Sequence, residues 1–163
     1  MLRLNLGSGR HPWPNARNRD YDERADEIGP VDKLPEYQDG SVDEIYAIHL
    51  FEHIDRMEAH LALTEWFRVL KDGGKLVLEL PCLDKIAAMI VAGEDRVQCT
   101  LFGIFGDIRE KSPYMFHKWC YTTKELCTMM QAAGFSVEVS EPVYHMKQRD
   151  MRLTGVKNGK QNS

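Results

Sequence analysis

The sequence predicts an α/β fold, in which a single domain forms a doubly wound, mostly parallel sheet with an antiparallel last strand. Segments with the period-two alternation or the unbroken apolar run of a strand take turns along the chain with segments of helical spacing. The nearly continuous apolar run at 75–80 is typical of a strand inside a parallel sheet. The last two strand-like segments, 135–140 and 150–156, have no helical segment between them, which favours a hairpin-like antiparallel pair.

The first strand runs directly into a glycine turn. Leu2, Leu4 and Leu6 alternate with polar residues, and Gly7-Ser8-Gly9 follows at once. Glycines let a ligand approach the backbone, and nucleotide-type ligands bind just beyond the carboxyl end of such a strand. The turn therefore predicts a nucleotide-type site, although Gly-Ser-Gly is also typical of an ordinary flexible turn.

The other elements follow in order. Further strands are expected at 16–22, 31–34 and 42–49, and helices at 84–91, between Asp55 and the glycine pair 73–74, and between Thr122 and Gly134. Asp55 with Glu58, and Thr122 with Glu125, have the spacing of a capping box that opens a helix. Residues 107–119 are expected to form a long loop that carries aromatic side chains.

Length and charge limit the classes of function. The 163 residues suffice for one domain, expected over 1–157, with 158–163 as a flexible tail. A net charge of -4 gives no general attraction for nucleic acid or for anionic membranes. No apolar run approaches a membrane span of about 20 residues, no signal peptide precedes the first strand, and the cysteines lack C-x-x-C spacing. We therefore expect a cytoplasmic protein with reduced cysteines.

Five stretches, in order along the chain, resemble the motifs of the class I S-adenosylmethionine-dependent methyltransferases. They are LNLGSG at 4–9, LP at 34–35 with DGSVDEI at 39–45, HLFEH at 49–53, WFRVLKDGGKL at 66–76 and LCTMMQAAGF at 126–135. The resemblance implies a Rossmann-like fold. Only about 11 residues separate Gly9 from Asp20, too few for a full helix and a strand, so the chain resembles a compact form that lacks most of the first helix.

The resemblance implies that the cofactor is S-adenosylmethionine, bound across the carboxyl ends of the first, second and fourth strands. The glycine turn is expected to approach its methionine end, Asp20 to accept hydrogen bonds from the ribose hydroxyls, and Tyr21 to lie against the adenosine. Pro30 stands where relatives often have an adenine-binding aspartate, so adenine recognition is assigned to Val31 and Asp32. A solvated surface charge is the alternative interpretation of Asp20. The complete set of expected cofactor-binding residues is Asn5, Leu6, Gly7, Ser8, Gly9, Asp20, Tyr21, Val31, Asp32, His49 and Leu50.

Residues 82–121 are expected to form a lid and substrate segment, because no other stretch within the chain is long enough to cover the active site. Five aromatic residues here are expected either to wall an acceptor pocket or to complete the core: Phe102, Phe105, Tyr114, Phe116 and Trp119. His117 is the candidate catalytic residue, a general base that takes a proton from a hydroxyl group. A purely structural histidine is the alternative interpretation.

The stretch His49-Leu50-Phe51-Glu52-His53 also matches H-x-x-E-H, a pattern of zinc proteases. That chemistry requires both histidines on one face of a helix. Because this stretch leaves the end of a strand instead, we expect no metal ligands here and no zinc in the protein.

We expect the protein to transfer a methyl group from S-adenosylmethionine to an oxygen or nitrogen atom of a small molecule or a glycan precursor. Nucleic acid and membranes are not expected partners, and the oligomeric state is left open. A nicotinamide-dependent oxidoreductase is one alternative, but it requires G-x-G-x-x-G, and Pro12 occupies the third glycine position. The other alternative is a degenerate methyltransferase fold that acts as a non-catalytic binding or partner subunit, which the missing helix and Pro30 favour.

Overall fold

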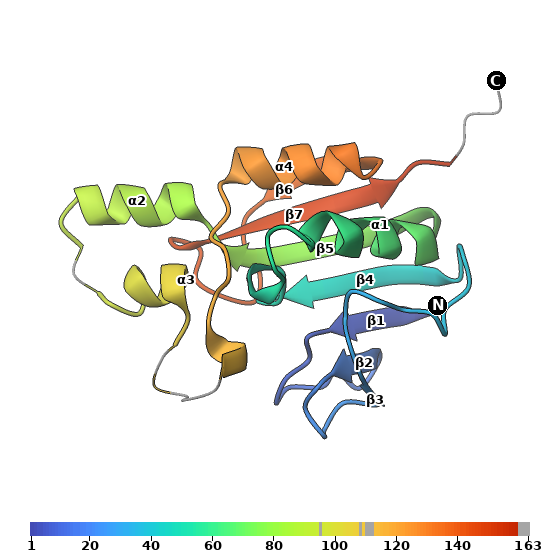
Figure 1. The fold of residues 1–163 in the computed structure, drawn as a ribbon. Coiled ribbons are helices and arrows are strands. Elements are labelled where there is room, and N and C mark those ends of the chain that lie inside the picture. The colour runs from blue at the N-terminus through green and yellow to red at the C-terminus, as the bar shows by residue number, and fades with distance from the viewer. Residues whose placement is uncertain (95, 108, 110–112, 160–163) are drawn as a thin grey trace.

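The computed structural model describes residues 1–94, 96–107, 109 and 113–159. Its centre is a seven-stranded sheet in the order β3-β2-β1-β4-β5-β7-β6 (Figure 1). The strands are β1 (Arg3–Leu6), β2 (Arg17–Asp20), β3 (Glu27–Ile28), β4 (Val42–Ile48), β5 (Leu70–Pro81), β6 (Phe135–Ser140) and β7 (Asp150–Lys157). β7 runs antiparallel to both β5 and β6, and the pairings among β1 to β5 are parallel. The predicted fold class is confirmed.

All of the described helices follow β4 in the chain. They are α1 (Ala59–Val69), α2 (Leu83–Val91), α3 (Leu101–Phe105) and α4 (Thr123–Ala132), with short 3-10 helices η1 (Phe51–His53) and η3 (Pro113–Met115). The Thr122 side chain accepts a hydrogen bond of 3.1 Å from the Glu125 backbone N–H, so this predicted cap is confirmed. Helix α3 was not expected, because its five residues are too short to show a periodic pattern.

The apolar core lies on one face of the sheet. Helices α1 and α4 lie on the same side of the strands in Figure 1, and Leu63, Trp66 and Leu126 from these helices are fully buried there. Because strand side chains alternate, Leu4 and Leu6 of β1 point into the same core. Burial of this apolar surface is the main driving force that holds the helices on the sheet.

The opposite face is covered differently from what the sequence suggested. Strands alternating with helices predict helical cover on both faces, but the connections from β1 to β4 contain no helix. Loop side chains pack there instead: the ring of Trp13 lies 5.0 Å from that of Tyr46 on β4 and 5.2 Å from that of Tyr144. The predicted absence of a full first helix between β1 and β2 is confirmed, since Pro12 and Pro14 disfavour a helix there.

The predicted third strand at 31–34 is wrong, because β3 is the shorter segment Glu27–Ile28. Pro30 and Pro35 flank the predicted segment and have no N–H to donate to a strand ladder. Leu34 is apolar because its side chain is fully buried in the core from a loop, and its backbone N–H donates to Glu65 on α1 at 2.8 Å. Apolar residues in a loop thus imitated the pattern of a strand.

The segment 82–121 lies beyond the carboxyl ends of β4 and β5. Figure 1 shows α2 and α3 at this end of the sheet, on the side to which the β4 and β5 arrows point. In parallel α/β sheets ligands bind at this edge. Among the described residues, no helix is long and apolar enough to cross a membrane.

Candidate functional site

A cavity of about 1000 Å³ lies beyond the carboxyl ends of β1, β2 and β4. Six parts of the chain line it: the glycine turn, the end of β2, the loop at Val31, the end of β4 with η1, residues within 98–118, and the connection before β7. The lining residues are Gly7, Gly9, Arg10, His11, Asp20, Tyr21, Asp22, Val31, His49, Leu50, His53, Ile54, Gln98, Phe102, Asp107, Arg109, Tyr114, Met115, Phe116, His117, Lys118, Met146 and Arg149. The tertiary structure thus brings eight of the predicted site residues to one place.

The glycine turn has a backbone that other residues rarely adopt. Gly7 has φ +69° and Gly9 has φ +49°, both in the left-handed region. A Cβ atom on Gly7 would lie 2.8 Å from Cδ1 of Leu50, whereas a Cβ on Gly9 would meet no atom within 4 Å. Gly7 therefore provides a close approach between β1 and the end of β4, and Gly9 leaves open space toward the cavity.

Asp20 is tied to this turn. Its Oδ2 accepts a hydrogen bond of 2.9 Å from the Gly9 backbone N–H, and its Oδ1 accepts one of 2.9 Å from the Asp22 backbone N–H. Arg19 pairs with Glu27 and Glu36, and Arg24 pairs with Asp22. Each carboxylate oxygen of Asp20 keeps acceptor capacity for a further donor, as a ribose-binding carboxylate requires.

Val31 lines the cavity on a loop that buried side chains hold in place. The indole Nε1 of Trp66 donates to the Val31 carbonyl at 2.8 Å. Arg19, only 7% exposed, donates to the carbonyls of Pro30 at 2.6 Å and Lys33 at 3.3 Å. Sequence reasoning missed both supports, because the all-polar sequence of β2 gives no sign that Arg19 is buried. Asp32 is not among the cavity-lining residues.

Tyr21 reaches across the cavity mouth. Its side chain is 59% exposed, and its ring stacks on that of Tyr114 with centroids 6.1 Å apart and planes inclined by 26°. This contact joins the end of β2 to η3. An exposed aromatic ring at this position offers a flat surface to a bound base.

Three of the predicted cofactor-binding residues turn their side chains away from the cavity. Asn5 is 3% exposed, and its Nδ2 donates to Oδ1 of Asn18 at 3.0 Å, so it joins β1 to β2. Leu6 is fully buried in the core, and Ser8 is 7% exposed. The side chains of these residues line no part of the cavity, because strand alternation and the turn direct them into the protein. A contribution from their backbone atoms stays a prediction.

His49 lies at the end of β4 with the positive φ of 51°, which is uncommon for a residue other than glycine. Its Nδ1 lies 3.1 Å from Oε1 of Glu52, and its Nε2 lies 3.2 Å from Oδ2 of Asp150. Burial lowers the pKa of the ring, but these two carboxylates outweigh burial and raise the pKa of His49 to about 9. His49 is therefore protonated at neutral pH and balances two buried acids.

Glu52, His53 and His117 form a cluster beside His49. Oε1 of Glu52 lies 3.9 Å from Nε2 of His117, and the rings of His53 and His117 are 4.8 Å apart. Glu52 is 1% exposed, and no donor among the described residues is aligned for a hydrogen bond with either of its oxygens. Burial opposes its charge, but the neighbouring histidines, His49 above all, lower the pKa of Glu52 to about 2. Burial lowers the pKa of His117, which favours its neutral form.

Both histidines of this cluster are oriented by backbone carbonyls. Nδ1 of His53 lies 3.1 Å from the Phe116 carbonyl, and Nδ1 of His117 lies 3.1 Å from the Gly103 carbonyl. A carbonyl oxygen only accepts, so each Nδ1 carries the hydrogen and, in a neutral ring, each Nε2 carries the lone pair. Sequence reasoning did not assign Glu52 and His53 to the site, although the H-x-x-E-H match was a signal.

The segment expected as a lid contributes part of its aromatic residues. Phe102, Tyr114 and Phe116 line the cavity, whereas Phe105 and Trp119, 59% and 44% exposed, do not. The segment is closed at its base by a bridge between Gly106 and Phe116. Residues 108 and 110–112 of the expected lid lie outside the described residues.

Arg149 also lines the cavity, although it is not among the predicted site residues. Its side chain is 12% exposed. Its Nε donates to Asp150 Oδ1 at 2.5 Å. Folding packs Arg149 between α3 and His49.

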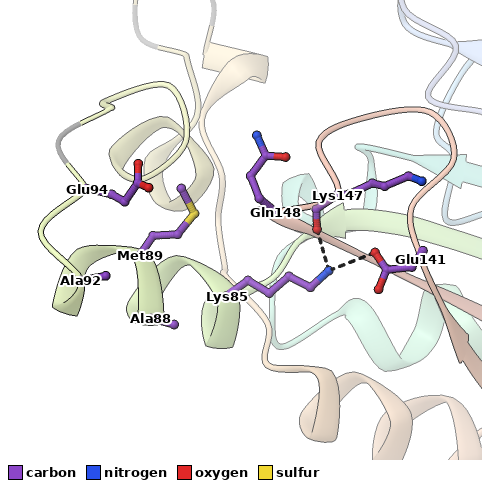
Figure 2. Close-up of a pocket in the computed structure, with 8 residues that line it drawn as sticks. All are labelled: Lys85, Ala88, Met89, Ala92, Glu94, Glu141, Lys147 and Gln148. Atoms are coloured by element: carbon purple, nitrogen blue, oxygen red, sulfur yellow. Dashed lines mark hydrogen bonds and ion pairs between the residues drawn. The ribbon is translucent and has the colours of Figure 1, made fainter.

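A second hollow of about 500 Å³ lies between α2 and the β6–β7 connection (Figure 2). Its prominent charged group is Lys85, whose Nζ donates to the carbonyls of Lys147 at 2.8 Å and Asp150 at 2.7 Å. Figure 2 shows the Lys85 side chain directed toward Lys147 and Glu141. These contacts give the lysine a structural role, so the larger cavity is the candidate site.

Comparison with known proteins agrees with this geometry. Residues 12–78 match the family model described as a methyltransferase domain. No curated protein sequence matches the chain. A S-adenosylmethionine-dependent methyltransferase from Methanosarcina mazei has a TM-score of 0.69 at 15% identity, over 96% of this chain and 92% of that chain. One from Thermotoga maritima has a TM-score of 0.67 at 19% identity, over 96% and 82%.

A third solved structure carries ligands. The 1,6-didemethyltoxoflavin-N1-methyltransferase of Burkholderia thailandensis, with 1,6-didemethyltoxoflavin and S-adenosylhomocysteine bound, has a TM-score of 0.66 at 14% identity, over 97% of this chain and 71% of that chain. The chain therefore contains a segment that matches the methyltransferase-domain family, and as a whole it has the fold of the class I S-adenosylmethionine-dependent methyltransferases.

Proposed function

We propose that the chain binds S-adenosylmethionine in the large cavity and transfers its methyl group to an oxygen or nitrogen atom of a small molecule or a glycan precursor. One observation carries the proposal: the cavity joins a glycine turn bonded to Asp20 with a cluster of oriented histidines. The ligand-bound Burkholderia enzyme of the same fold supports the cofactor assignment.

The residues at the turn fit this cofactor. Gly9 faces open space, so a methionine portion has room beside the backbone. Asp20 keeps lone pairs for the two ribose hydroxyls, Tyr21 offers a ring face to adenine, and the Val31 loop forms the opposite wall. A cavity of about 1000 Å³ is at the upper end of ordinary ligand sites, which leaves room for an acceptor beside the cofactor.

His117 is the residue that we assign to the acceptor. Its Nδ1 is held by the Gly103 carbonyl, and its Nε2 lone pair takes the proton that the acceptor hydroxyl or amine loses. When bound, the cofactor supplies a methyl carbon whose bond to sulfur breaks, with the electron pair staying on sulfur, as the acceptor atom bonds to that carbon. The protein contributes mostly position and exclusion of water, because a sulfonium is already a good leaving group.

Phe102, Tyr114 and Phe116 support a small organic acceptor, because aromatic walls suit apolar rings or sugar faces. We expect the reaction to take place in the cytoplasm, with neither nucleic acid nor a membrane as partner. The non-catalytic alternative predicts that the cavity binds cofactor without turnover, or binds nothing.

Calorimetry with S-adenosylhomocysteine tests the proposal. A separate titration with NADH tests the oxidoreductase alternative. We expect a dissociation constant in the micromolar range, about 8 kcal/mol of binding free energy, for S-adenosylhomocysteine alone. Mass spectrometry of the purified protein is expected to find S-adenosylmethionine or its product carried through purification. Binding of NADH instead would support the oxidoreductase, and binding of neither would support the non-catalytic subunit.

A further inference from the structure

We propose that Glu52, His53 and His117 bind a divalent transition-metal ion, of which Zn²⁺ is the best fit, in the wall of the cavity. One ligand atom from each residue lies within 4.8 Å of the other two. Zinc ligands stand about 2.0–2.2 Å from the ion and therefore roughly 3–4 Å from one another, so modest side-chain rotation closes the site. His53 and His117 line the cavity, and Glu52 lies buried behind them.

The state of Glu52 is the first independent support. Glu52 is 1% exposed, and its Oε2 has no polar partner among the described residues, which makes this carboxylate costly to bury. The contact with His49 at 3.1 Å involves Oε1 alone. A cation in front of His53 and His117 would satisfy the remaining lone pairs.

The orientation of the two histidines is the second support. Each donates its Nδ1 hydrogen to a backbone carbonyl, of Phe116 for His53 and of Gly103 for His117, both at 3.1 Å. Metal-binding histidines almost always have such an outer partner, which fixes the tautomer and the ring plane. Each Nε2 lone pair is thereby left free to bind an ion, and Nε2 of His117 lies 3.9 Å from Oε1 of Glu52.

This site differs from that of a zinc protease. The H-x-x-E-H pattern would use His49 and His53, but the ring nitrogens of His49 face Glu52 and Asp150. The proposed third ligand is His117. It is 64 residues away from His53 in the sequence, so the five-residue motif does not include it. The sequence-based expectation of no metal considered only the local pattern.

The ligand set points to the class of metal. Two imidazoles and one carboxylate suit Zn²⁺ and its neighbours, whereas Mg²⁺ and Ca²⁺ prefer oxygen atoms alone. Three protein ligands leave a position open toward the cavity, as in zinc sites that bind a substrate or water. The role of the ion rests on the proposed function: it would bind the acceptor oxygen and make the hydroxyl more acidic, so that the proton passes to water. In that metal-bound state the Nε2 lone pair of His117 holds the ion and is not the base.

Titration of the chelator-treated, full-length protein with Zn²⁺ tests the site, without cofactor or acceptor. We expect one ion per chain by calorimetry, and Co²⁺ in its place is expected to give the visible absorption bands of nitrogen and oxygen ligation. His53→Gln and His117→Gln are each expected to weaken Zn²⁺ binding about ten-fold or more. His60→Gln, an exposed histidine on α1, is the matched control and is expected to change nothing.

Folding of each variant is checked by thermal unfolding, and Zn²⁺ is expected to raise the unfolding temperature of the wild type and of His60→Gln but not of His53→Gln. The metal site would be overturned if the wild type shows no saturable Zn²⁺ binding, or if His53→Gln and His117→Gln leave Zn²⁺ binding unchanged. Glu52 would then serve only as the ion-pair partner of His49. S-adenosylhomocysteine is titrated separately. Zn²⁺ binding without S-adenosylhomocysteine binding would contradict the proposed function and support the metal site. S-adenosylhomocysteine binding without Zn²⁺ binding would contradict the metal site and support the proposed function.

Discussion

The backbone N–H of Gly9 donates a 2.9 Å hydrogen bond to Oδ2 of Asp20. This bond ties the glycine turn after β1 to the end of β2, although no helix stands between the two strands to hold them in register. A second bond, from the Gly7 N–H to the Arg19 carbonyl at 2.8 Å, reinforces the link. The cofactor end of the cavity is therefore organised by the turn itself.

Replacing Asp20 tests this arrangement. Asp20→Ala is expected to weaken S-adenosylhomocysteine binding by about 1–3 kcal/mol, because charge-assisted bonds to the ribose are lost. Calorimetry measures the change, and Asp72→Ala, at an exposed aspartate far from the cavity, is the control. Unchanged affinity in Asp20→Ala would return Asp20 to the class of solvated surface charges.

Gly7 and Gly9 form a matched pair for a second prediction. Both have positive φ, so alanine at either position costs roughly 1–2 kcal/mol of backbone strain. Gly7→Ala is expected to lower the free energy of unfolding further, because its Cβ would lie 2.8 Å from Leu50.

Gly9→Ala adds its methyl group to open space, so its additional effect is expected on cofactor affinity rather than stability. Urea unfolding and calorimetry separate the two effects. Equal stability losses with equal affinities would show that neither glycine approaches a ligand.

His117→Ala gives a third prediction. Turnover is expected to fall while the affinity for S-adenosylhomocysteine stays nearly intact, because His117 belongs to the acceptor side of the cavity. Single-turnover rates and calorimetry on the same preparation provide the measurement. If the variant unfolds, or loses cofactor binding outright, His117 is a structural residue held by Gly103.

Closure of residues 107–119 is a fourth prediction. A bridge joins Gly106, just before the segment, to Phe116 within it, and Gly106 has φ +87° and lies against the Met115 backbone. Limited proteolysis of the free protein is expected to cut within 107–119, and S-adenosylhomocysteine is expected to slow the cut.

Gly106→Ala is expected to increase the rate of cleavage, because a Cβ there would overlap the Met115 carbonyl and open the base of the segment. Gly93→Ala, which also has positive φ but no atom within 4 Å of a Cβ, is the control. Cleavage elsewhere, or at a rate that the ligand does not affect, would count against a lid.

Much of the fold was predictable because its signals are local. The alternation of Leu2, Leu4 and Leu6, the apolar run of β5 and the cap at Thr122 each act within a few residues. The false strand at 31–34 shows the limit, since a loop side chain such as Leu34 is buried as deeply as one in a strand. The spacing of apolar residues indicates which side chains are buried, but it does not indicate which backbone groups form hydrogen bonds with one another.

The sequence by itself determined the fold class and the glycine turn, because backbone conformation and motif spacing are properties of neighbouring residues. The roles of Asp20 and His117 stay predictions from the same motifs. Only the tertiary structure decided which distant side chains meet. It turned Asn5 toward Asn18, placed Arg149 against His49 and Asp150, and brought His117 to Glu52 and His53. These contacts form where strands and loops that are distant in the sequence meet at the carboxyl ends of the strands. No spacing along the chain specifies which of them meet.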